Sequence, residues 1–272
     1  MRDRTHVLTY VALLTVTAAA WLHVLWTMLA DDMAGMDMAV PLGVLDGVVF
    51  VASWTVMMTA MMLPSALPMI ALYAATQRTW GASNGPPKPP ERSGRPGEAG
   101  APLGRAVRAA AVTLFTLIYL GVWALTGIPI YFGSVILGRL DPGMRAYGIA
   151  GMLVVAGLFQ LSWLKQVCLR NCRTPLGFLL GHWRPGWRGG LTMGWQHALY
   201  CLGCCWALMV VLVAAGAMGL AWVLLIAAVV AVEKLVPHGE WIARLGGVAL
   251  VLLGLAVAVR PELATVLRGP AM

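Results

Sequence analysis

Long apolar stretches separated by short polar segments run along almost the whole chain. An α-helix needs about 20 apolar residues to cross the hydrocarbon core of a bilayer, so each stretch predicts one membrane-spanning helix. We expect about seven such helices, at residues 7–30, 46–75, 106–137, 145–164, 191–215, 218–236 and 240–259. The pattern therefore predicts an all-α fold: a polytopic transmembrane helix bundle that forms a single membrane domain over residues 1–272.

Composition supports this interpretation, because 60% of the residues are hydrophobic, 11% are charged and the mean hydropathy is +0.80. The segment 76–104 differs from the rest: it is rich in Pro and Gly and carries scattered charges. Such a segment buries little apolar surface, so we expect a flexible cytoplasmic linker there. We interpret the first apolar stretch as a retained helix rather than a cleaved signal, because it continues through Trp21 to Leu29.

The distribution of basic residues predicts the orientation of the bundle. With a cytoplasmic N-terminus, fifteen of the 19 Lys and Arg residues fall on the cytoplasmic side. This bias favours an N-in, C-out topology, and we expect a multi-pass protein of the bacterial inner membrane. Topology also accounts for most of the net charge of +8. No basic patch with interleaved aromatic residues is present in a soluble module, so we do not expect nucleic acid as a partner.

Soft metal-ligand side chains recur every four residues in the stretch 191–215, at Met193, His197, Cys201, Cys205 and Met209. This spacing places all five on one face of a helix. Cys204 adds a third thiol within the same turn. Single cysteines are often only small buried hydrophobic residues, but three cysteines in five residues, after a histidine, favour a metal site.

Two further clusters carry the same kind of side chain. In the second stretch, Met57/Met61 and Met58/Met62 are two i, i+4 pairs just before Pro64, and by length they reach the same bilayer depth as Cys201. At the end of the fourth stretch, Cys168 and Cys172 are again four residues apart, and basic neighbours are expected to lower their thiol pKa. The basic neighbours are Lys165, Arg170 and Arg173.

Three blocks of sequence together resemble a bacterial family of uncharacterised, predicted metal-binding integral membrane proteins. The blocks are MMTAMMLPSA (Met57 to Ala66), KQVCLRNCRTP (Lys165 to Pro175) and GGLTMGWQHALYCLGCCWALM (Gly189 to Met209). The resemblance implies a multi-helix membrane fold in which the Cys and Met positions are candidate ligands. It implies no reaction.

Ligand softness favours Cu(I), because thiolates and thioethers select this ion and carboxylates are absent from both central clusters. Zinc and iron remain alternatives. The predicted metal ligands are Met57, Met58, Met61, Met62, Cys168, Cys172, Met193, His197, Cys201, Cys204, Cys205 and Met209. Three more thioethers, Met33, Met36 and Met38, lie in the first outer loop.

The leading hypothesis is a membrane protein that handles or translocates Cu(I) along an outer Met site, a central Met and Cys site, and an inner Cys168/Cys172 site. One alternative is a membrane oxidoreductase, either metal-dependent or using Cys201-Leu-Gly-Cys204 as a thiol–disulfide pair. Another is an accessory subunit with a structural metal. From the sequence we expect the lipid bilayer and a metal ion as partners. A partner protein in the membrane or periplasm is a further possibility that the sequence leaves open.

Overall fold

The structure is a computed structural model that describes residues 4–29, 43–79, 104–216 and 219–268, and every regular element within these ranges is a helix. The helices are α1 (Arg4–Leu29), α2 (Val44–Thr79), α3 (Arg105–Arg139), α4 (Pro142–Leu161), α5 (Trp163–Arg173), α6 (Pro175–His182), α7 (Gly186–Ala214), α8 (Leu220–Leu235), α9 (Gly239–Val259) and α10 (Leu263–Arg268). The predicted all-helical bundle is confirmed. Residues 33–38 and most of the predicted linker lie outside the described residues.

Six helices in the described part of the chain, α1, α2, α3, α4, α7 and α9, are long and apolar enough to cross a membrane. The sixth predicted stretch, 218–236, forms α8, which has 16 residues and is therefore about 24 Å long. Gly219 caps its start, and Val236 is extended before Pro237. A residue before proline disfavours helical geometry, which explains why α8 ends there.

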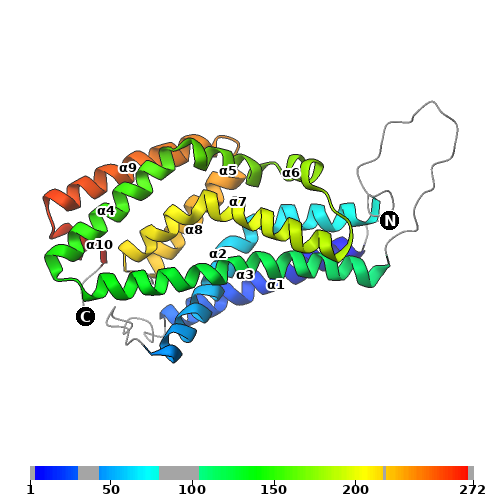
Figure 1. Cartoon of the computed structure of the whole chain (residues 1–272), viewed down its shortest axis with the longest axis horizontal. Coiled ribbons are helices and arrows are strands. Elements are labelled where there is room, and N and C mark those ends of the chain that lie inside the picture. Colours follow the sequence, from blue (N-terminus) through cyan, green and yellow to red (C-terminus); the bar gives the residue numbers. More distant parts are fainter. Residues whose placement is uncertain (1–3, 30–42, 80–103, 217–218, 269–272) are drawn as a thin grey trace.

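The beginning of α1 and helix α10 lie at opposite ends of the bundle (Figure 1). The six long helices and the shorter α8 connect these two ends. An N-in, C-out topology needs the two ends on opposite sides of the membrane. Which end is cytoplasmic stays a prediction.

Helix α7 is the central element of the bundle. In its membrane window 67% of the residues are buried, against 22% in α1 and in α9. It packs against α3, α4, α5 and α8, while α2 packs mainly against α1 and α3. A Cβ atom on Gly190 or Gly194 would collide with the backbone carbonyls of Ala111 and Phe115 of α3. These two glycines therefore allow α3 and α7 to pack with their backbones in contact.

Two helix boundaries differ from the prediction. Helix α2 continues through Pro64 and Pro68 to Thr79, so the first residues of the predicted linker are helical. The stretch 145–164 is not one helix, because Ser162 is extended and separates α4 from α5. The Ser162 side chain accepts a hydrogen bond from the backbone N–H of Lys165 at 3.3 Å and caps α5. As a separate helix, α5 packs against α7.

Candidate metal site

Four thiols from two helices meet beside the middle of α7, and we call them the thiol cluster: Cys172 of α5 and Cys201, Cys204 and Cys205 of α7. The Sγ atoms of Cys204 and Cys172 are 3.8 Å apart, and those of Cys204 and Cys205 are 3.4 Å apart. The thiol of Cys201 interacts with each of the other three. The α7 members are each only 1% exposed. The cluster is therefore a dense group of sulfur donors inside the bundle.

Two polar side chains from other helices contact the thiol of Cys201. The hydroxyl oxygen of Tyr119, on α3, lies 3.1 Å from its Sγ atom. The ammonium group of Lys234, on α8, donates to the same Sγ atom at 3.0 Å. Four helices thus converge on this site. The sequence analysis missed both residues as site residues, although a lysine within an apolar stretch is itself a signal of function.

The cysteines of α5 do not form a separate inner site. Cys172 belongs to the thiol cluster, and Cys168, one turn earlier, packs against α7 at Gly203, where an added Cβ would lie 2.6 Å from its Sγ atom. This contact corrects the expectation that the Cys168/Cys172 pair forms an inner site separate from the central cysteines. The central and inner cysteines occupy one place because α5 folds onto α7.

The basic residues of α5 do not lower the thiol pKa values as expected. Burial raises the pKa of the Cys168 thiol. The hydrogen bond with Cys201, together with burial, holds the pKa of Cys172 well above its usual range. Two of the three basic groups of α5 are engaged elsewhere, since Lys165 pairs with Glu233 and Arg173 donates to the carbonyl of Val236. Their charge is therefore not directed at the cysteines.

His197 lies one turn before Cys201 inside a box of aromatic rings. Its ring centroid is 5.7 Å from those of Tyr119 and Phe178, and 5.8 Å from that of Phe115. It is 2% exposed, and its Nδ1 atom has no hydrogen-bond partner within the described ranges. Met193 and Met209, at the two ends of the stripe, are buried on the same helix. The stripe is thus buried along its whole length.

The methionine cluster of α2, formed by Met57, Met58, Met61 and Met62, is also buried. Two side chains join its C-terminal end to the thiol cluster. Tyr119 donates to the carbonyl of Met62 at 3.2 Å, and Lys234 donates to Ser65 at 3.1 Å. Because both also contact Cys201, this part of α2 lies one side chain away from the thiols.

A buried polar network lies near the α8 end of the site. Lys165 Nζ is 2.7 Å from Glu233 Oε2, and Gln160 donates to Glu233 Oε1 at 2.9 Å. Lys165 and Glu233 are 0% and 1% exposed, so this is a fully buried ion pair. Lys165 and Lys234 are two of the fifteen basic residues that the topology prediction assigns to the cytoplasmic side. The structure buries both of them, although the basic bias toward that side persists without them.

One distance in the thiol cluster equals the distance between two ligands of a shared metal ion. Sulfur ligands about 2.3 Å from a tetrahedral zinc lie about 3.8 Å from each other, which is the distance between Cys172 and Cys204. In the described part of the chain, however, no three His, Cys, Asp or Glu side chains form a ready-made metal site. The Cys204 thiol donates a hydrogen bond to the carbonyl of Cys201 at 3.1 Å. A metal would therefore have to displace thiol protons before it binds.

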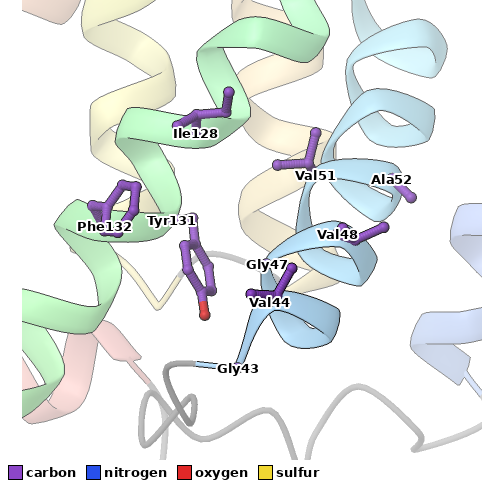
Figure 2. A pocket seen from close by; sticks show the side chains of 9 residues that line it. All are labelled: Gly43, Val44, Gly47, Val48, Val51, Ala52, Ile128, Tyr131 and Phe132. Atoms are coloured by element: carbon purple, nitrogen blue, oxygen red, sulfur yellow. The ribbon is translucent and has the colours of Figure 1, made fainter.

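A prominent groove of about 600 Å³ lies elsewhere, between the start of α2 and the second half of α3 (Figure 2). Figure 2 shows Val48 and Val51 on one side and Ile128 and Phe132 on the other. None of the residues that line it carries sulfur. The groove is therefore an apolar surface feature and not a part of the metal site.

Comparison with known proteins adds one match. Residues 51–257, about three quarters of the chain, match the model of the PpoB2 family, which is described as a copper chaperone family. No curated protein and no solved structure matches the chain significantly. The matched region contains both the methionine cluster and the thiol cluster, and the apolar helices identify a multi-pass membrane protein. The chain thus belongs to the PpoB2 copper chaperone family.

Proposed function

We propose that this protein binds Cu(I) at the thiol cluster within the membrane and passes the ion to an acceptor by exchange of ligands. The observation that carries the proposal is the contact between four thiols of α5 and α7 in a chain of a copper chaperone family. Thiolates prefer Cu(I) to harder ions, and the hydrogen-bond partners of the sulfurs are other thiols, a hydroxyl, an ammonium group and a backbone carbonyl. Each thiol that binds releases its proton.

The methionine cluster supports a route to the thiols. Thioethers bind Cu(I) without releasing a proton, because they carry none. The cluster ends at Met62, whose carbonyl is joined to Cys201 through Tyr119, and the following Ser65 is joined to Cys201 through Lys234. We therefore place the thioethers of α2 before or after the thiol cluster on the path of the ion. We infer from the basic-residue bias that α5 and α6 lie on the cytoplasmic side, and we propose the bacterial inner membrane as the location.

The test is a Cu(I) titration of the anaerobically purified protein in detergent, in competition with a chromogenic Cu(I) chelator. The variant Cys201→Ser/Cys205→Ser removes two sulfurs from α7. Cys168→Ser is the matched control, because this cysteine lies on α5 but packs against Gly203. We expect the wild type and the control to compete with the chelator and the double variant to fail. Equal binding by all three proteins would refute the thiol cluster as the copper site.

The same titration separates the alternatives. Copper that returns to added chelator within minutes is expected of a chaperone, whereas copper released only on unfolding indicates a structural metal. A thiol oxidoreductase instead predicts a mixed disulfide with a partner when Cys201 or Cys204 alone is replaced. Trapping such a disulfide, with no copper bound by the wild type, would replace the copper proposal.

A further inference from the structure

We propose that Lys234 is a fixed counter-ion that makes the thiol cluster prefer Cu(I) over Zn(II). This inference rests on the proposed function and adds a residue that determines the choice of metal. Lys234 does not bind the metal itself. It places one positive charge beside the sulfur atoms that do.

Lys234 has no carboxylate partner among the described residues. Its ammonium group donates to Cys201 at 3.0 Å and to Ser65 at 3.1 Å. The neighbouring carboxylate of Glu233 is occupied on both oxygens, by Lys165 and by Gln160. The groups close enough to interact with the charge of Lys234 are instead the four thiols of the cluster, the hydroxyl of Tyr119 and the imidazole of His197. The only anions that this contact set can supply are thiolates or a phenolate.

An unpaired buried cation is costly in the interior of a membrane protein. Lys234 is 8% exposed and lies in the last turn of α8, where the helix dipole favours a positive charge. The dipole offsets only part of the cost. Metal binding supplies the rest, because each thiol that binds a metal becomes a thiolate.

Charge counting shows which metal benefits. A complex of Cu(I) with two thiolates carries a net charge of −1, whereas the same two thiolates with Zn(II) are neutral. For any equal number of thiolates, the Cu(I) complex is more negative by one charge. A cation 3.0 Å from one ligand sulfur therefore stabilises the Cu(I) complex more than the Zn(II) complex. One Cu(I) ion, two thiolates and the Lys234 ammonium group together carry no net charge, which suits a buried site.

Three replacements of Lys234 separate charge from hydrogen bonding. Lys234→Met removes the charge and the donor, Lys234→Gln keeps a donor without charge, and Lys234→Arg keeps the charge. Affinities for Cu(I) and for Zn(II) are measured by chelator competition on each purified full-length protein. A charge-assisted hydrogen bond is worth about a 10- to 100-fold change in affinity. We expect the Met and Gln variants to bind Cu(I) more weakly by this factor and to bind Zn(II) no more weakly than the wild type. The Arg variant should retain the preference for Cu(I) over Zn(II).

Each result decides the matter. The inference is overturned when the Cu(I) and Zn(II) affinities of the Met and Gln variants fall together, since that is the result of a distorted site. It is also overturned when the Lys234→Gln variant binds Cu(I) as tightly as the wild type. It is also overturned when the wild type binds Cu(I) and none of the variants changes the metal preference, which leaves the proposed function standing. Failure of the wild type to bind Cu(I) refutes both proposals. Should the Met variant not fold, the Gln and Arg variants give the answer.

Discussion

Gly203 controls how closely α5 approaches α7, and replacing it tests the position of Cys172. A Cβ atom at Gly203 would lie 2.6 Å from the Sγ atom of Cys168 and 3.4 Å from its Cβ atom. Ordinary contacts of this kind are about 3.5–4.0 Å, so Gly203→Ala leaves a shortfall of about 1 Å at the sulfur. The Cys168 side chain has one rotatable bond, and its sulfur faces α7. We therefore expect α5 to shift outward and carry Cys172 away from Cys204.

The size of the effect follows from two opposing contributions. Overpacking costs about 1–3 kcal/mol, while replacing a helix-interior glycine by alanine gains about 1 kcal/mol. Gly203→Ala alone should then range from neutral to about 2 kcal/mol destabilising. Adding Cys168→Ala removes the sulfur and leaves only the 3.4 Å contact. The double variant should recover the overpacking cost, which gives a coupling of about 1–3 kcal/mol between the two sites.

The assay is a double-mutant cycle with two measurements on each protein in detergent: the thermal unfolding midpoint and the Cu(I) affinity. A loss of 1 kcal/mol lowers the midpoint by about 2–4 °C in a chain of this size. We expect Gly203→Ala to lower Cu(I) affinity and Cys168→Ala to restore it in the double variant. Additive effects of the two changes, or a Gly203→Ala variant with wild-type copper affinity, would show that the approach of α5 does not set the thiol cluster.

Two further predictions use buried contacts. Lys165→Met leaves Glu233 buried without its cation and should destabilise the protein by about 3–5 kcal/mol. The double variant Lys165→Met/Glu233→Gln should recover much of this loss. Thermal unfolding of both variants checks the prediction, and equal unfolding midpoints would contradict it. Gly190→Val puts a side chain against the backbone carbonyl of Ala111, which cannot rotate away, so we expect folded protein to be lost. Size-exclusion profiles measure this loss. Gly181→Val, with open space at its Cβ, is the control.

The helices were predictable from the sequence, but their breaks were less so. Apolar length alone located each of the six long helices, because lipid requires about the same span from every one. The separation of α4 from α5 at Ser162 carried a weaker signal, a single N-cap residue without Gly or Pro. Its consequence is large, since a continuous helix would have carried Cys172 away from α7.

The candidate site was half predictable for a similar reason. The spacing of Cys201, Cys204 and Cys205 places them together within one helix, so local periodicity was enough. Cys172, Tyr119 and Lys234 join them only through packing between helices, which one sequence does not reveal.

Glu233 and Lys234 illustrate the limit of sequence patterns most clearly. They are neighbours in sequence but point about 100° apart around α8, because an α-helix has 3.6 residues per turn. Glu233 therefore enters the network with Lys165, and Lys234 enters the thiol cluster. Adjacent charges of opposite sign suggest a local pair, and the helix geometry instead sends each to a different partner.

The burial of the thiol cluster limits how copper can reach an acceptor. Each α7 thiol is 1% exposed, so ligand exchange with an acceptor requires one element to move. Helix α5 is the best placed, because it supplies one thiol, is bounded by the nonhelical residues Ser162 and Thr174, and with 11 residues is too short to span a membrane. The ion pair of Lys165 with Glu233 holds α5 against α8. Lys165 precedes Cys172 by seven residues, which is about 10 Å along the helix. Arg173, next to Cys172, also donates to the carbonyl of Val236, so moving the cysteine end of α5 away from α7 requires this exposed hydrogen bond to break, while the Lys165–Glu233 pair two turns away stays formed.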